Sequence, residues 1–167
     1  MLERGEVKRE LSKFGRNVQV SARTNLIGRN ATKKLANSID FEVEVFPNSF
    51  SFEMFMEDYG EYLDKGVSGT ETKYNTKYSY KNKMPPTSAF DKWSVIRGLA
   101  GRDDKGRFLS REGLKYALAL NKFKHGQKPT LFFTRAFEQH FSELPDKIIE
   151  AYGLDVENLM ETTLKTD

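Results

Sequence analysis

Alternation between apolar and charged residues organises the stretch from residue 38 to residue 66. From residue 39 to 45 the odd-numbered positions are apolar and the even-numbered ones are charged, while from 50 to 56 the even-numbered positions are apolar. A period of two is typical of strands with one buried and one solvent-facing side. The turn-forming cluster Pro47-Asn48-Ser49 separates the two runs, so the pattern predicts a β-hairpin.

The same pattern predicts the register of the hairpin. Directly opposed residues share a face, so the two apolar rows coincide only if the connecting loop has an even number of residues. The opposed pairs that we expect are Val45 with Phe50, Val43 with Phe52, Phe41 with Met54 and Ile39 with Met56. Two strands are rarely stable alone, so we expect helices and a further strand to cover this face.

Helical spacing precedes the hairpin. It predicts a helix from near Glu6 to about Ile27 that ends at Gly28, then a turn at Arg29-Asn30 and a short helical segment over residues 31–37. The apolar stripe expected to lie across the hairpin consists of Val7, Leu11, Phe14 and Val18.

A short helix and a long loop are expected after the hairpin. Residues 59–66 show helical spacing over two turns closed by Gly66, and we expect Tyr59 and Tyr62 to pack in the core. Residues 67–87 show neither helical nor strand period, which predicts a long loop. The lysines and tyrosines of this loop are Lys73, Lys77, Lys81, Lys83, Tyr74, Tyr78 and Tyr80.

Two further helices are predicted between residues 88 and 125. Ser88 opens the first, with Asp91 completing a variant capping box, and Ser110 caps the second, which ends at His125-Gly126. A polar turn over residues 100–109 joins them. The packing face of the first helix is Phe90, Trp93 and Ile96. The second helix carries two stripes and is therefore expected to make contacts on two sides. The first stripe is Leu114, Ala117, Leu118 and Asn121, and the second is Tyr116, Leu120 and Phe123.

The closing helix follows Pro129-Thr130, is kinked or restarted at Pro145 and is expected to end at Gly153. Residues 154–167 are acidic and are expected to form a short helix followed by a frayed tail. Its apolar stripe is Phe133, Phe137, His140, Phe141 and Leu144. The chain is therefore expected to be α+β and a single domain over residues 1–167. A sheet based on an antiparallel hairpin would pack against an N-terminal and a C-terminal helix, with a long loop and a helical insertion.

Composition narrows the class of protein. The chain has no cysteine, which excludes disulfides and thiolate metal sites. The N-terminus is charged from its third residue and no apolar run approaches membrane-spanning length, so we expect a soluble protein that matures inside a cell, without a membrane partner.

The net charge of +3 is distributed in blocks of alternating sign. Residues 1–37 carry +6, residues 38–66 carry −7, residues 67–128 carry +9 and residues 129–167 carry −5. Such blocks fit internal pairing, a solvated surface or complementary faces of identical subunits.

A search for catalytic chemistry gives one weak pattern. Glu57-Asp58 followed by Glu71-Thr72-Lys73 is the order of acidic and basic residues with which one nuclease superfamily holds Mg²⁺, but these residues fall in a polar loop rather than on a strand. His125 and His140 are expected to be structural. We therefore expect no catalytic, cofactor-binding or metal-binding residues and no enzyme activity.

The long loop interleaves basic and aromatic residues, a composition that can bind nucleic acid through phosphates and base stacking. The alternative, which we favour, is a mobile loop that becomes ordered against a neighbouring protein. The lysines Lys73, Lys77, Lys81 and Lys83 are the candidates for facing DNA. The candidates for a subunit interface are Tyr74, Tyr78, Tyr80, Trp93, Phe108 and Tyr116.

Two segments carry a family resemblance. Ser38-Ile39 entering a strand and then Tyr59-Gly-Glu-Tyr62-Leu-Asp64-Lys-Gly66 resembles the Tyr-x-x-Tyr-Val-Glu-x-Gly-Thr signature of the tail-completion, or neck, proteins of tailed double-stranded-DNA bacteriophages. Residues 129–138 are similar to that family's Pro-x-Pro-Phe-Leu-x-Pro-Ala segment. The positions that correspond to the family's two motifs are Tyr59, Tyr62, Asp64, Gly66, Pro129, Phe133 and Ala136, with Asp64 standing where the family usually has Glu.

The resemblance covers most of the chain except an insertion of about residues 72–128, and it departs from the family at Asp64, Val67 and Thr134, where Glu, Thr and Pro are usual. It implies a structural subunit of a ring, usually sixfold, that joins the head connector to the tail and lines the DNA channel of the virion after assembly in the host cytoplasm. The implied partners are further copies of the chain, connector or adaptor and tail proteins, and, transiently and non-specifically, the genomic DNA. No catalysis or cofactor is implied.

Overall fold

The computed structural model describes residues 5–28, 33–46 and 49–165 and has the predicted α+β class. The chain divides into two compact units. The hairpin unit comprises residues 1–57 and 132–167, and the insert unit comprises residues 58–131. The predicted turns at Arg29-Asn30 and Pro47-Asn48 lie outside the described residues.

The hairpin consists of β1 (Asp40–Phe46) and β2 (Ser49–Phe55), paired antiparallel. Three predicted pairs are confirmed, Val45 with Phe50, Val43 with Phe52 and Phe41 with Met54. The fourth is wrong, because the ladder stops at Asp40 and Phe55, and the Ile39 carbonyl instead accepts hydrogen bonds from the side chains of Gln19 and Arg23. Among the described residues the sheet has two strands, so the expected further strand is also wrong.

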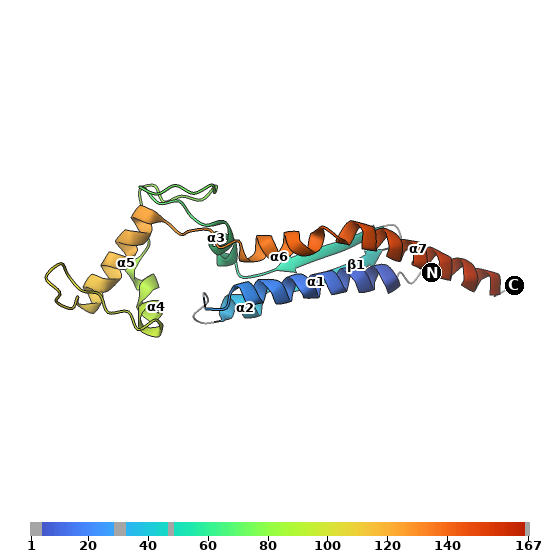
Figure 1. Cartoon of the computed structure of the whole chain (residues 1–167), viewed down its shortest axis with the longest axis horizontal. Helices are drawn as coiled ribbons and strands as arrows, with labels where there is room; N and C mark the ends of the chain where they lie inside the picture. The colour runs from blue at the N-terminus through green and yellow to red at the C-terminus, as the bar shows by residue number, and fades with distance from the viewer. Residues whose placement is uncertain (1–4, 29–32, 47–48, 166–167) are drawn as a thin grey trace. The chain divides into compact units, whose positions relative to one another are not determined.

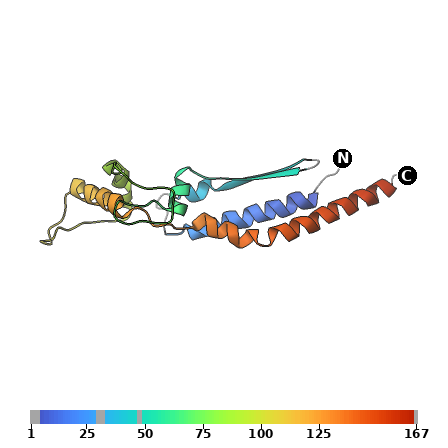
Figure 2. The same cartoon turned by 90° about the horizontal axis from the view of Figure 1, so that it is seen from above.

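Helix α1 (Gly5–Asn25) covers the apolar face of the hairpin, and its buried residues include all four of the predicted stripe. Figure 2 shows the hairpin as one layer and α1 with the C-terminal helices as the other. The Phe14 ring lies 5.1 Å from Phe52 and 5.5 Å from Phe137, measured between centroids. The short helix α2 (Lys34–Ser38) leads into β1 and buries Leu35.

The C-terminal helices α6 (Phe132–Phe141) and α7 (Leu144–Lys165) pack along α1 (Figure 1). Of the predicted stripe, Phe133, Phe137, His140 and Leu144 are half-buried. The side chains that α6 buries are Phe132 and Ala136, whereas Phe141 is 46% exposed. The predicted end at Gly153 is wrong, because α7 continues through that glycine to Lys165.

A buried carboxylate attaches the part of α7 beyond Gly153 to the start of α1. Asp155 is 4% exposed, and its two oxygens accept hydrogen bonds from the backbone amides of Glu6 (3.0 Å) and Val7 (3.1 Å). The first amides of a helix have no partner within the helix, so Asp155 supplies from α7 the cap that α1 needs.

The insert unit contains α3 (Tyr59–Lys65), the 3₁₀ turn η1 (Thr87–Phe90), α4 (Asp91–Ile96) and α5 (Arg111–His125). The cap at Ser110 is confirmed, since its hydroxyl accepts the Gly113 amide at 3.1 Å. The capping box at Ser88 is wrong. Neither η1 nor α4 has a side-chain cap, and the Asp91 carboxylate pairs with Arg111 at 3.0 Å instead.

Several apolar residues of the insert unit are more exposed than their spacing predicts. Tyr59 and Tyr62 are 42% and 47% exposed, so their expected burial in the core is wrong. Ile96 is 54% exposed, and the residue that α4 buries is Ser94. In α5 the buried residue is Ala119, which belongs to neither predicted stripe. The unit therefore presents much of its apolar surface outward.

No helix in the described part of the chain is long and apolar enough to cross a membrane.

The two glycines inside long helices of the hairpin unit give a matched test of this packing. A Cβ atom on Gly15 would lie 2.5 Å from Cδ2 of Phe41, whereas a Cβ atom on Gly153 would meet nothing within 4 Å. Replacing glycine by alanine within a helix raises the free energy of unfolding by about 1 kcal/mol where the new methyl group has open space. We expect Gly153→Ala to raise the free energy of unfolding by about 0.5–1 kcal/mol. Gly15→Ala should lower it by about 1–2 kcal/mol, because overpacking outweighs the helix propensity.

Urea unfolding followed by circular dichroism measures both changes. Stabilisation by Gly15→Ala equal to that by Gly153→Ala would contradict the close packing of α1 on the hairpin.

The cap provided by Asp155 is tested by removing its oxygens. Asp155→Ala leaves two buried amides without an acceptor, so we expect a loss of about 1–3 kcal/mol in the free energy of unfolding. Asp155→Asn keeps one acceptor oxygen and should lose less. The exposed neighbour Glu157 is the control, and Glu157→Ala should change stability by less than about 0.5 kcal/mol. Similar effects of the Asp155 and Glu157 changes on urea unfolding would show that the cap does not stabilise the fold.

Candidate functional site

The two segments that carry the family resemblance meet in the insert unit. The Leu63 carbonyl accepts the hydroxyl of Thr130 at 2.7 Å, and the Asp64 carbonyl accepts the Thr130 amide at 3.1 Å. Gly66 has a φ of 75°, and a Cβ atom there would lie 2.7 Å from Pro129. We call this meeting point the motif junction. It explains why glycine stands at position 66, since a larger residue there would be both strained and blocked.

A charged network lies on the outside of α3. The Glu61 carboxylate accepts a hydrogen bond from Lys65 at 2.8 Å and pairs with Lys77 at 3.3 Å. The bond from Lys65 is the largest cause, ahead of Tyr78 and Lys77, that lowers the pKa of Glu61 to about 2. The ring of Tyr62 lies 4.5 Å from that of Tyr78, so this exposed motif tyrosine packs against the long loop.

The long loop, residues 67–87, lacks regular helix or strand as predicted, but main-chain hydrogen bonds hold it in place. Ser68 exchanges backbone bonds with Tyr78 and Tyr80, both at 2.9 Å. The amides of Thr70 and Glu71 donate to carbonyls at the end of α5, each at 2.9 Å. These bonds join the start of the loop to its later part and to the end of α5.

Lysines and tyrosines of the loop face different ways. Tyr74, Tyr78 and Tyr80 are half-buried, and burial raises the pKa of Tyr80. The lysines Lys73, Lys77, Lys81 and Lys83 are exposed. The tyrosines therefore pack largely within the loop, whereas the lysines are exposed to solvent. Of the candidate residues in this loop, the lysines are the ones that a partner could reach.

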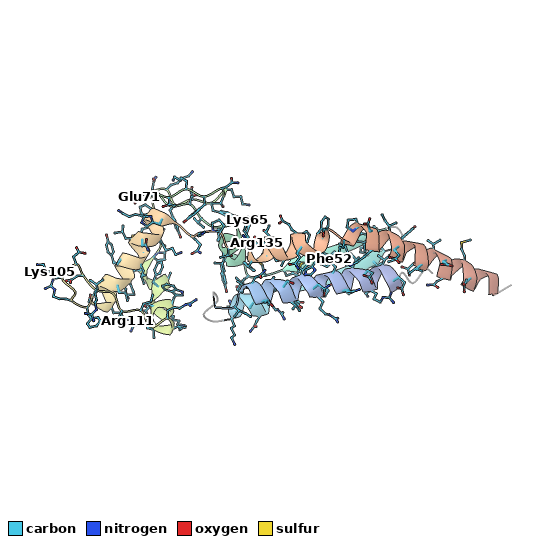
Figure 3. The ribbon with its side chains drawn as sticks, in the orientation of Figure 1. Phe52, Lys65, Glu71, Lys105, Arg111 and Arg135 are labelled. Atoms are coloured by element: carbon cyan, nitrogen blue, oxygen red, sulfur yellow. The ribbon has the colours of Figure 1, made fainter. Side chains whose placement is uncertain are left out.

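A second basic element is the turn over residues 101–109, which we call the tip loop. The Asp103 carboxylate accepts bonds from the amides of Lys105 and Arg107 and from Nε of Arg107, and these bonds, led by the Arg107 amide, lower the pKa of Asp103. The guanidinium of Arg102 lies 3.8 Å from the centroid of the Phe108 ring. Figure 3 shows Lys105 on this loop and Arg111 at the start of α5.

The three apolar interface candidates of the insert unit are exposed. Trp93 is 39%, Tyr116 55% and Phe108 67% exposed. Each of them is therefore accessible to a partner.

The outer face of the hairpin is acidic. Glu42, Glu44 and Glu53 are exposed on the side away from α1, and Glu42 stands directly opposite Glu53 in the ladder. Asp40, at the start of β1, is exposed too, but its carboxylate accepts a hydrogen bond from Gln19 of α1 at 3.2 Å. Glu42, Glu44 and Glu53 have no ion-pair partner in the part of the chain that the structure describes. Phe46 and Phe55, each 46% exposed, end the same row. We call this surface the outer hairpin face.

The residues of the nuclease pattern are engaged in local contacts. Glu57 pairs with Lys34 at 3.0 Å, Glu71 pairs with Lys124 at 3.0 Å, and Nζ of Lys73 donates to the Gly69 carbonyl at 2.8 Å. Among the described residues, no three or more His, Asp or Glu side chains are grouped so as to hold a metal ion.

The histidines make contacts of a structural kind. Nε2 of His140 lies 2.9 Å from the Ser21 hydroxyl, and Nδ1 of His125 lies 3.1 Å from the Thr72 hydroxyl.

The hollows found along α1 and α7 are open and lined largely by charged residues such as Lys13, Glu10 and Lys147. The candidate functional site consists of surfaces: the long loop, the tip loop and the outer hairpin face.

Charge separates the two units. The insert unit has 15 basic and 8 acidic residues, a net charge of +7, whereas the hairpin unit has 12 basic and 16 acidic residues, a net charge of −4. The blocks seen along the sequence thus become one basic and one acidic unit.

Sequence reasoning missed two carboxylates that organise these surfaces. Asp155 binds amides about 150 positions earlier in the chain, for which no local signal exists. Asp103 lay in a predicted turn, where an Asp two residues before a turn amide is a recognisable signal.

Comparisons of the chain with protein-family models, with curated proteins and with solved structures found no match.

The network around Glu61 predicts a titration. Because its folded pKa of about 2 lies below the ordinary value of 4.5, its contribution to stability is present above pH 4.5 and is lost as the pH falls towards 2. We expect the Glu61 side-chain carboxyl signal in NMR to titrate with a midpoint near 2. Lys65→Met should move the midpoint towards 4.5, since it removes the hydrogen bond that contributes most to the lowered pKa of Glu61. A midpoint near 4.5 in the unmodified chain would contradict the network.

Proposed function

We propose that this protein is a structural subunit of the neck of a tailed bacteriophage, in a closed ring of identical subunits between the head connector and the tail. The family that the sequence resembles forms rings that are usually sixfold. The partners are then further copies of the chain, the connector or adaptor, and the tail proteins. No catalytic step or cofactor belongs to this proposal.

The observation that supports the proposal most is the motif junction. The two resembling segments are about 65 residues apart in sequence, yet the Thr130 hydroxyl and the Leu63 carbonyl are 2.7 Å apart. The two segments flank the insertion that the resemblance does not cover, so their contact closes that insertion at its base, as an insertion into the family's fold requires.

The surfaces agree with an assembly subunit. Trp93, Phe108 and Tyr116 are exposed, and the outer hairpin face displays carboxylates without partners in the described residues. A subunit needs apolar anchors and complementary charge on its surface more than it needs a deep pocket.

A second candidate function is a basic nucleic-acid-binding protein, favoured by the net charge of +7 on the insert unit and its exposed lysines. Binding through phosphates weakens steeply as salt rises. In the neck, by contrast, the same lysines would line a channel through which DNA slides, and tight binding would be a disadvantage.

Removal of the protein from its phage tests the proposal. Without it, infected cells should accumulate DNA-filled heads and free tails, because the two cannot be joined. Adding the purified protein to an extract of those cells should restore infectious particles, and cryo-electron microscopy should place it as a ring on the neck axis.

The control in that extract is the Glu157→Ala variant, which alters an exposed residue outside the surfaces described above and should restore joining fully. Normal tailed particles without the protein would refute the neck assignment. Tight, salt-sensitive DNA binding together with absence from the particle would favour the second candidate.

A further inference from the structure

We propose that the tip loop of one copy of this chain binds the outer hairpin face of a second copy. The inference rests on the proposed ring of identical subunits and specifies which surfaces join them. Its partner is therefore another copy of the chain, in a head-to-tail contact that uses different patches on the two subunits.

The outer hairpin face has the chemistry of a receptor for cations. Glu42 and Glu53 are directly opposed, an arrangement that is unfavourable in an isolated sheet. Glu44 lies two residues along the same strand, about 7 Å away. A cationic partner would relieve the repulsion among these carboxylates, and Phe46 and Phe55 at the two ends of the row offer it apolar contact.

The tip loop has the complementary chemistry. Residues 101–109 carry three basic and two acidic side chains, and Arg107 is paired with Asp103 at 2.8 Å within the loop. Arg102 and Lys105 are exposed and form no ion pair among the described residues, so they are the cations that the loop offers to a partner. Phe108 is the most exposed aromatic side chain of the insert unit in the described residues, at 67%. The loop is already ordered by Asp103, so little conformational freedom is lost when it binds. Arg102 stacked on Phe108 presents a charge and an apolar surface together.

A second copy is the occupant that fits best. A nucleic acid would be repelled by the carboxylates of this face, and the chain itself supplies a cationic, aromatic loop of matching character. The acidic C-terminal segment from residue 143 onward is a weaker receptor, because Asp155 is buried against the amides of α1 and Glu143, just before α7, is paired with Lys147 at 2.5 Å.

Charge reversal on each side tests the contact in the full chain. The hairpin variant combines Glu42→Lys, Glu44→Lys and Glu53→Lys, and the tip variant combines Arg102→Glu and Lys105→Glu. A control with the same charge change as the hairpin variant combines Glu138→Lys, Glu150→Lys and Glu157→Lys, which are exposed residues of α6 and α7. Circular dichroism checks that every variant is folded.

Self-association is measured by sedimentation velocity at roughly 50 mM salt over about 10–500 µM protein, where charge contacts are weakly screened. The unmodified chain should associate, and each of the two variants alone should associate at least about tenfold more weakly. An equal mixture of the two variants should recover association, because the basic tip of one meets the acidic hairpin of the other. The α6–α7 control should associate like the unmodified chain.

Three results would overturn the inference: an unmodified chain that stays monomeric throughout, a mixture that fails to recover, or a control that weakens association as much as the hairpin variant. Each is distinct from failure of the proposed function. If the protein lies on the neck axis but its association does not depend on these charges, the proposed interface is wrong and the proposed function stands. If the protein is absent from the neck but associates as expected, the proposed function is wrong and the interface stands.

Discussion

The apolar face of a two-stranded hairpin cannot bury itself, and helix α1 meets that need. It presents Phe14 to the hairpin on one side and to α6 on the other, with ring contacts to Phe52 and Phe137. Gly15 lets the Phe41 ring approach the helix backbone. The register of the hairpin, the course of α6 and α7 and the buried position of Asp155 all depend on this one helix, because each of them is defined by what it contacts on α1.

The sequence predicted those parts of the fold in which local pattern and tertiary contact agree. The period-two rows predicted the hairpin with three of its four expected pairs, and the stripe of α1 was predicted in full. Ser110 was recognised as a cap because its partner lies three residues away. The class of the fold follows from these elements.

Features that depend on distant residues were not predicted. Asp91 is a plausible capping residue from its neighbours, but Arg111, 20 positions later, takes its carboxylate. Gly153 is a plausible helix end, but α7 continues through it to the residue that caps α1. The exposure of Tyr62 and Ile96 could not be predicted either, since helical spacing shows which residues share a face and not whether anything covers it. The candidate surfaces were predicted as residue types, and the structure showed which of them are accessible.

The motif junction also bears on how such a chain can change over evolutionary time. It brings residues 67 positions apart into hydrogen-bond contact at the base of the insert unit. The entropy of closing a segment grows only with the logarithm of its length, so doubling the segment costs about 0.6 kcal/mol. Once the base is closed, helices can be added to or removed from the segment between at little energetic cost to the rest of the chain. The insert unit is thus the part of this protein whose length can change while the hairpin and α1 keep their contacts.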